Sequence, residues 1–551
     1  MNKNDRCTVE TVNFHAADTK GHGHAERFLM HGGTVIVTTG ALSCTRGVLN
    51  SARSVGLAGR VICADCTRSE YACGRQGEAI GRALNEALRI KGTSLVILYA
   101  SCLDVLAQTD FDSIIRNADN PGNIPVKVFF RGPMVKRMMD VPGEAEKILS
   151  LTEPKDCTLS NDQVALPGMC PDFSSVCSIL QHWDCYVFLM DAGGCPGCIT
   201  DTGSGQECTP IKSSRLDDVQ LATGPEKLIE NGILSDITES GMTGKTAFLI
   251  GSSTLSFAGV DYEGIAAAVE NNGIETVLVS SSGFAPGPIG AEELFMRTAE
   301  KLVRTPIRKD PSRVNILGFD PVIFKDTGKI AHGIEHLEKR GLNGYIWGYE
   351  GMDDIRISSE ASLNWVVSAE GMSLAEYMKD AFGIPYITGI PIGKNAMLEW
   401  RKKVNVLTDR DDEELEEPSG PNSFCSVSAA VIGEPMLSWS VRNCLTGSIG
   451  IKDVRILCQD TPDGMLEEFY SRMLPYGKEI LYSHDAESLR ELTKDCGAVI
   501  ADPVYKAFLN DKRFVSIPYP LISGTEYTSS EYMIFGKKGE AYLRKGLDLN
   551  Q

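Results

Sequence analysis

Six cysteines occur between residues 170 and 208, and two of them have a spacing that can bind a metal. Cys195 and Cys198 belong to the sequence Gly-Gly-Cys-Pro-Gly-Cys, which closely follows an apolar run at 186–190. An apolar run of this length before glycines predicts a buried strand that leads into a tight loop. Glycines let the backbone approach a bulky ligand because they have no Cβ, and thiolates are soft metal ligands. We therefore expect this loop to hold an iron–sulfur cluster.

The same cysteines have plainer interpretations. A single buried cysteine such as Cys177 or Cys185 often behaves as a small hydrophobic side chain without any chemistry. A Cys-x-x-Cys pair also occurs in zinc sites and in redox dithiols. Structural zinc usually needs a second close pair of cysteines or histidines, and none occurs in the fifty residues after Cys198. An iron–sulfur site is therefore favoured over zinc.

The composition limits the class of protein and its partners. A chain of 551 residues predicts three or four domains, and 42% hydrophobic with 23% charged residues is typical of soluble globular proteins. The net charge of -19 argues against nucleic acid, because phosphate binding needs clustered Lys and Arg. No apolar run is long enough to cross a membrane, and the first thirty residues lack the core of a signal peptide. We therefore expect a cytoplasmic protein without membrane partners, whose 17 cysteines are reduced.

Strands and helices alternate in the N-terminal part of the chain. Strands are predicted at 35–44, 95–102 and 124–133, and a helix at 78–89. This alternation is typical of a parallel sheet, whose sites lie at the carboxyl ends of the strands. Cys44 and Cys102 end two of these runs, so they can face the same crevice.

The first 300 residues contain a weak internal repeat with an offset of about 150 residues. The matching pairs are 186–195 with 35–44, 248–265 with 97–114, and 274–279 with 124–129. Ser253 takes the place of Cys102 in the second copy, and Cys170 lies upstream of that copy's first strand. We interpret the repeat as a degenerate duplication; two unrelated α/β units are the alternative.

The chain as a whole is expected to be α/β, with several Rossmann-like domains built on parallel sheets. The predicted domains are 1–150, a degenerate duplicate of the next; 151–308, the cysteine-rich cluster domain; 309–408, a second Rossmann-like domain; and 423–551, a third. An acidic linker is predicted at 409–422. A long helical region is expected from Ala361 to Phe382, and strands of the last domain at 426–433, 453–459 and 497–503. No complete G-x-G-x-x-G motif occurs, so a nicotinamide cofactor is not predicted.

Two pairs of polar residues are assigned structural roles. Asp110 and Asp261 occupy matching positions in the two copies and are expected to cap helix N-termini. Arg131 and Arg215 are expected to form surface salt bridges, with contact to an anionic substrate or partner as the alternative.

Several motifs, taken in order, resemble those of the nitrogenase component 1 superfamily. This superfamily includes the nitrogenase α and β subunits, their cofactor scaffold proteins and the dark-operative protochlorophyllide reductase subunits. The resemblance covers about residues 165–540. The matching pieces are Cys170-Pro171, the Gly-Gly-Cys-Pro-Gly-Cys loop, Ser214-Arg215-Leu216 with Gly224, Gly251-Ser252-Ser253 with Gly259-Val260-Asp261, 314–318, and 362–386 with 391–393.

The resemblance implies three Rossmann-like domains in a subunit that works in pairs or tetramers. The first domains of two subunits would share an iron–sulfur cluster, of the 4Fe–4S type, and electrons would come from an ATP-dependent iron protein. By position, Cys170 matches the first cluster cysteine, and Cys198, or alternatively Cys195, matches the second. The third position falls on Ser252 or Ser253, which departs from the family, and Cys208 or Cys195 is the expected substitute.

The N-terminal copy complements this incomplete set. Cys44 and Cys102 match the second and third family positions, whereas no cysteine occupies the first. The resemblance therefore suggests that residues 30–150 act as a built-in partner domain, so that both copies share one cluster within a single chain. The alternative is that the N-terminal copy pairs with another component 1-like subunit, giving a homo- or hetero-oligomer.

The expected chemistry is a reduction, with its substrate left open. Nitrogenase α subunits hold their catalytic metal cofactor through a cysteine of the middle domain, and Ser368 stands at or near that place here. A molybdenum nitrogenase activity is therefore not expected, whereas a β-like role or reduction of an organic substrate such as a tetrapyrrole remains open. The alternatives are a non-enzymatic scaffold for cluster assembly and a degenerate structural subunit.

Overall fold

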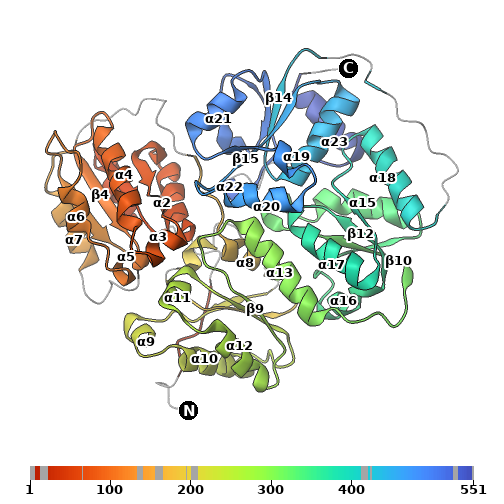
Figure 1. Cartoon of the computed structure of the whole chain (residues 1–551), viewed down its shortest axis with the longest axis horizontal. Helices are drawn as coiled ribbons and strands as arrows, with labels where there is room; N and C mark the ends of the chain where they lie inside the picture. Colours follow the sequence, from red (N-terminus) through yellow and green to blue (C-terminus); the bar gives the residue numbers. More distant parts are fainter. Residues whose placement is uncertain are drawn as a thin grey trace. The chain divides into compact units, whose positions relative to one another are not determined.

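The computed structural model describes most of the chain and divides it into two compact units (Figure 1). The described residues are 6–12, 23–64, 66–132, 140–154, 166–193, 195–199, 209–410, 420–421, 425–524 and 531–548. The first unit comprises Met1–Cys177, Cys185–Gly205 and Thr209–Gly287, and the second comprises Ser178–Asp184, Gln206–Cys208 and Pro288–Gln551. Each unit contains two sheets with helices beside them, so the α/β fold class is confirmed.

The first sheet of the first unit has the order β3-β2-β4-β5, and all its strands are parallel. The strands are β2 (Thr34–Thr38), β3 (Val61–Cys63), β4 (Leu95–Ala100) and β5 (Val126–Phe130). Alternate residues of β2 enter two different cores. Val35 and Val37 pack with α4 (Gln76–Arg89), whereas Ile36 packs with α1 (Gly23–Met30) and α2 (Leu42–Ser54). Because both faces are covered, the central strands are apolar throughout.

The second sheet of this unit repeats the order of the first. It runs β1-β7-β6-β8-β9, in which only β1 (Glu10–Thr11) is antiparallel to its neighbour. The other strands are β6 (Tyr186–Leu189), β7 (Ile211–Ser213), β8 (Ala247–Ile250) and β9 (Thr276–Val279). Without β1, the order β7-β6-β8-β9 is the order β3-β2-β4-β5 shifted by one copy.

The helices between these strands recur with the same spacing. The pairs are α3 (Arg68–Ala72) with α9 (Asp218–Ala222), α4 with α10 (Glu226–Glu239), α5 (Cys102–Leu106) with α11 (Ser253–Ala258), and α6 (Phe111–Arg116) with α12 (Tyr262–Asn271). Each second member begins 150 or 151 residues after the first. Asp110 and Asp261 cap α6 and α12 by accepting hydrogen bonds from Ser113 N and Gly264 N, as predicted. The shared order supports the interpretation of an internal duplication.

The second unit contains two further parallel sheets. The sheet β11-β10-β12-β13 is built from β10 (Asp310–Leu317), β11 (Asn343–Ile346), β12 (Ala361–Val366) and β13 (Tyr386–Thr388). The sheet β16-β15-β14-β17-β18 is built from β14 (Ala429–Ile432), β15 (Val454–Gln459), β16 (Leu481–Ser483), β17 (Ala498–Ala501) and β18 (Arg513–Ser516). Helices in these regions include α14 (Pro321–Phe324), α15 (Gly328–Glu338), α17 (Met372–Phe382), α18 (Lys394–Leu407), α19 (Pro435–Cys444), α20 (Met465–Met473), α21 (Ala486–Thr493) and α23 (Gly536–Gly546).

Two expectations about local structure were wrong. The long helical region predicted from Ala361 begins instead with strand β12, and the helix is confined to α17. Strand β12 lies between β10 and β13 and is almost entirely buried, so its apolar run has no alternation that would distinguish it from a buried helix. Cys44 lies in the first turn of α2 rather than at a strand end, because β2 stops at Thr38.

The predicted domain ranges each contain one sheet, except that β1 joins the sheet of the second range. The boundaries themselves stay a prediction, and the acidic linker at 409–422 lies largely outside the described residues. Across the described part of the chain, every helix is too short or too polar to span a lipid bilayer.

Candidate cysteine site

The loop that carries Cys195 is held by a buried carboxylate. Asp191, which follows β6, is fully buried and accepts hydrogen bonds from Gly193 N at 2.6 Å and Arg215 N at 3.1 Å, and from the Ser213 hydroxyl. These bonds tie the loop to the neighbouring strand β7. The 3-10 helix η5 (Cys195–Cys198) starts directly afterwards, so Asp191 positions Cys195 at the carboxyl end of the sheet.

The N-terminal copy approaches this loop through helix α2, which packs against η5. Ser43 Oγ lies 3.3 Å from Ser253 Oγ, and Ser253 Oγ lies 3.8 Å from Cys195 Sγ. On the other side, Cys44 Sγ lies 4.0 Å from Ser43 Oγ. Two serine hydroxyls therefore connect a thiol of the first copy with a thiol of the second.

Helix α5 brings Cys102 to the same region by packing against α11, which begins at Ser253. Burial raises the pKa of the Cys195 thiol to about 12, and the nearby Asp191, Cys44 and Cys102 raise it further by charge repulsion. The thiols of Cys44, Cys102 and Cys195 are thus close enough to influence one another. Three segments that are far apart in the sequence place sulfur donors around Ser253.

Cys170 borders this region on the segment that leads into α8 (Asp172–Leu180). The residue is fully buried, and its Sγ contacts Pro171 O at 3.6 Å. Asp172 accepts hydrogen bonds from Ser282 N and Gly283 N, both at 2.8 Å, and so ties α8 to the loop after β9. That loop contacts the serines of the site, because Gly283 O accepts a hydrogen bond from Ser43 N.

Two glycines let the backbone come close to the site. A Cβ at Gly283 would lie 2.7 Å from Ser43 Oγ and 2.9 Å from Ser253 Cβ. A Cβ at Gly132 would lie 2.3 Å from Cys102 Sγ. Both glycines have positive φ angles, which favour glycine. A larger side chain at either position would therefore displace the groups that surround Ser253.

The structure brings together Cys44, Cys102 and Cys195, and places Cys170 on an adjacent segment. The side chain of Cys198 and all of Cys208 lie outside the described residues. Within the described part of the chain, no three His, Cys, Asp or Glu side chains are arranged to hold a single metal ion. An iron–sulfur cluster spans several atoms, so its ligands lie farther apart than those of one ion, and thiolates are its usual donors. The donor set and the glycine-lined approach fit such a cluster.

Comparison with known proteins identifies the family. The family model of the nitrogenase component 1 type oxidoreductases matches residues 170–529, which is more than half of the chain. The chain belongs to this family. The match begins at Cys170, so Cys44 and Cys102 lie outside it.

Individual relatives of this nitrogenase component 1 family member are distant. A segment of 114 residues is 29% identical to a subunit of the light-independent protochlorophyllide reductase of Prosthecochloris aestuarii; it covers 20% of this chain and 21% of that protein, about a fifth of the relative's length. A solved structure described as nitrogenase Cp1 at pH 6.5 has a TM-score of 0.52 and 11% identity, covering 73% of this chain and 96% of the other. The same protein at pH 5 gives a TM-score of 0.50 and 17% identity, covering 75% and 95%. At these identities the two structures show the fold.

In this family member, Ser253 rather than Ser252 faces the cysteines. Ser252 is the N-cap of α11, and its backbone N and O contact Tyr262 OH at 3.2 Å. Ser253 begins the helix and contacts Ser43 and Cys195. Cys102 begins α5 in the same way, because Ser101 is the N-cap there. The position left open between Ser252 and Ser253 is therefore resolved by which residue starts the helix.

The two arginines have different surroundings. Arg215 pairs with Glu10, and both side chains are partly exposed, as expected for a surface salt bridge. Arg131 instead donates hydrogen bonds to Cys44 O at 2.8 Å and Thr39 O at 3.4 Å. Its own carbonyl lies 3.8 Å from Cys102 Sγ. The expectation of a surface salt bridge was therefore wrong for Arg131, which links the segments of both N-terminal cysteines.

Buried carboxylates were missed in the sequence. Asp104 accepts hydrogen bonds from Ser101 N and Tyr71 OH at 2.7 and 2.9 Å, which fixes the start of α5 next to Cys102. The spacing of Ser101 and Asp104 is that of a capping box, so this residue had a sequence signal. Asp172 and Asp191 bind backbone groups more than twenty residues away, and no local pattern indicates those partners.

Replacing Asp172 with alanine is expected to destabilise the first unit by about 3 kcal/mol or more. Backbone donors on Phe173, Ser282 and Gly283 would lose their acceptor in a buried place, at a cost of about 1–3 kcal/mol each. The midpoint of urea unfolding, followed by circular dichroism, measures the loss. Asp110→Ala is the matched control, because it removes an exposed helix cap worth about 1 kcal/mol. Equal losses in the two variants would contradict the role given to Asp172.

Proposed function

We propose that this chain is a nitrogenase-like oxidoreductase subunit whose two N-terminal copies together hold one iron–sulfur cluster. The observation that carries the proposal is the approach of Cys44 and Cys102 to Cys195 within one compact unit. The family to which the chain belongs consists of oxidoreductases, which supports a redox role. In the proposal, the first copy replaces the partner subunit that the family resemblance implies.

The residues around Ser253 would bind the cluster and exclude water. Cys44, Cys102 and Cys195 would be ligands, and Cys170 and Cys198 would complete the set. When bound, such a cluster supplies one-electron transfer at a potential that burial and hydrogen bonds to sulfur adjust. Asp104, Asp172 and Asp191 hold the three ligand-bearing segments, and Arg131 fixes the backbone beside Cys44.

The proposed partners follow from the family. Electrons would come from an ATP-dependent iron protein in the cytoplasm, and a second component 1-like subunit would complete an oligomer. The substrate class we favour is an organic molecule such as a tetrapyrrole. The curated relative is a protochlorophyllide reductase subunit by name, which supports this choice.

Iron and acid-labile sulfide, measured on protein purified without oxygen, test the proposal directly. We expect about four of each per chain, together with a broad visible absorbance that bleaches on reduction. Turnover is then measured with an iron protein, ATP and a tetrapyrrole. Protein that binds zinc or no metal under these conditions would contradict the proposal.

A scaffold function is the second candidate, and the partial exposure of two cysteines favours it. Cys44 and Cys102 are only partly buried, and a serine replaces one expected ligand. A cluster at such a site is more open to exchange than a fully buried one. Transfer of iron to an apo-acceptor protein, without turnover alongside an iron protein, would favour the scaffold. A degenerate structural subunit would bind no cluster at all.

A further inference from the structure

Two fully buried carboxyl groups meet in the second unit, at the carboxyl ends of its two sheets. Glu434 follows strand β14 and is 1% exposed, and Glu370 follows strand β12 within the short helix η7 (Ala369–Gly371) and is 0% exposed. Their charges interact, because Glu434 raises the pKa of Glu370. The carboxyl ends of parallel strands are where such folds bind ligands. Neither residue belongs to the cysteine site, which lies in the first unit.

Glu434 is held as an acceptor by backbone donors from two segments. Its carboxylate accepts from Ala369 N at 3.0 Å, Met436 N at 3.0 Å and Leu437 N at 2.6 Å. The last two belong to the first turn of α19, whose N-terminus favours negative charge. The geometry therefore stabilises an ionised Glu434 even though the group is buried.

Glu370 has no comparable support. Neither of its carboxyl oxygens has a hydrogen-bond partner in the described structure. The nearby Ser368 hydroxyl is committed to Gly318 O. The hydroxyls of Tyr470 and Tyr519 are also buried without partners among the described residues. A buried polar group without a partner is costly, so four polar atoms in one region need a donor or a bridge.

The groups around the pair are acids on every side. Glu434 interacts with Cys458, Tyr470, Tyr476 and Tyr519, and Asp320 faces Glu370. Burial raises the pKa of Glu434 to about 7, and only backbone N–H groups lower it. Within the described chain, no cationic side chain forms an ion pair with Glu370 or Glu434. The site lacks the positive charge that buried carboxylates normally have.

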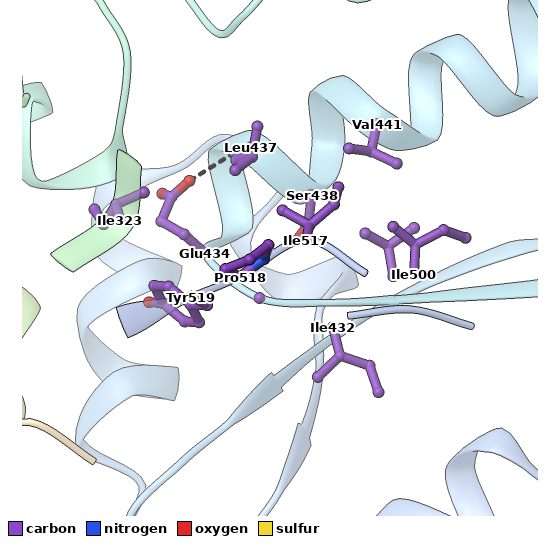
Figure 2. A pocket seen from close by; sticks show the side chains of 12 residues that line it. Ile323, Ile432, Glu434, Leu437, Ser438, Val441, Ile500, Ile517, Pro518 and Tyr519 are labelled. Atoms are coloured by element: carbon purple, nitrogen blue, oxygen red, sulfur yellow. Dashed lines mark hydrogen bonds between the residues drawn. The ribbon is translucent and has the colours of Figure 1, made fainter. Parts of the chain in front are cut away.

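A cavity of about 310 Å³ adjoins the pair (Figure 2). Figure 2 shows Glu434 and Tyr519 at one end and Val441 and Ile500 at the other. The remaining lining is mainly apolar, with Ile323, Val431, Ile432, Leu437, Ile517 and Pro518. The cavity is therefore amphipathic: one end offers anionic and phenolic oxygens, and the rest offers hydrocarbon. Its volume is at the small end of ligand pockets.

We propose that this cavity binds a small organic cation, with an ammonium or amidinium group at the Glu370–Glu434 pair and an apolar body against the isoleucines and valines. A nitrogen cation with several N–H donors would neutralise the pair and supply hydrogen bonds to Glu370 and Tyr519. A bare metal ion fits less well, because the described residues hold no group of three ligands for one ion and the walls are apolar. The proposal does not depend on the cysteine site.

Calorimetric titration of the full chain with benzylammonium and with benzyl alcohol tests the proposal. The two probes have nearly the same shape and differ in charge. At pH 8 we expect benzylammonium to bind at least about tenfold more tightly than the alcohol. Its affinity should rise up to about tenfold per pH unit from pH 6 toward 7, because the cation needs a deprotonated pair. Equal binding of the two probes, binding that does not change with pH, or no binding would overturn the proposal.

Two variants locate the binding. Glu370→Gln removes a charge without removing a hydrogen bond, and should weaken benzylammonium binding at least about tenfold. Glu376→Gln, on the exposed side of α17, should bind as the unchanged chain does. Wild-type affinity in Glu370→Gln would overturn the assignment of the site. If Glu370→Gln does not fold, as judged by circular dichroism, the charge and pH comparisons on the unchanged chain still decide.

Discussion

Replacing both Cys44 and Cys102 with alanine is expected to reduce the iron content of the anaerobically purified protein to less than about a tenth. The reason is that the second copy has a serine at the position of Cys102, so its own described cysteines leave the ligand set incomplete. A cluster that loses two of its thiolate ligands has water or hydroxyl groups in their place, which bind iron weakly at neutral pH. Iron, sulfide and the visible spectrum are measured on the same preparation.

Controls separate this effect from misfolding and from a partner subunit. Cys73→Ala changes an exposed cysteine of the same copy and should keep the iron content. Circular dichroism shows whether the double variant retains its fold. Unchanged iron in a folded double variant would contradict the shared cluster. Iron that appears only in an oligomer with another subunit, as judged by sedimentation, would favour pairing between chains over pairing within this one.

The second unit is expected to lose stability as the pH rises from about 4.5 to 7. Glu434 keeps its proton in the folded state up to a pKa of about 7, whereas the unfolded chain releases it near the ordinary value of 4.5. Between these values the folded state binds more protons, so the free energy of unfolding falls as pH rises and is highest below 4.5. A shift of this size corresponds to a loss on the order of 3 kcal/mol. Glu370, whose pKa burial and Glu434 raise, acts in the same direction.

Tryptophan fluorescence can follow this unit by itself. All five tryptophans, Trp183, Trp347, Trp365, Trp400 and Trp439, belong to the second unit. Urea unfolding at pH 5 and pH 8 is therefore compared by fluorescence. Glu370→Gln should be more stable than the unchanged chain at pH 8 and should show a flatter pH dependence, because one buried charge is gone. Glu376→Gln should follow the unchanged chain; a rise in stability from pH 5 to 8 would contradict the role of the pair.

Much of the fold follows from local patterns. The apolar runs that predicted strands at 95–102, 124–133 and 453–459 overlap β4, β5 and β15, because strands covered on both faces have continuous apolar sequences. The order of motifs after Cys170 predicted the nitrogenase component 1 family, which the family match confirmed. The failure at 361–366 has the same origin, since a buried strand and a buried helix have similar composition.

The sequence by itself determined the α/β class, the family and a cysteine-rich loop after a buried strand. Tertiary structure alone decided which residues meet: Ser43 with Ser253, Asp172 with Gly283, and Glu370 with Glu434. Local patterns record whether a segment repeats every two or every 3.6 residues, which depends on backbone geometry within that segment. Contacts between distant segments depend on how helices pack on sheets, and one residue of register at a helix start decided between Ser252 and Ser253.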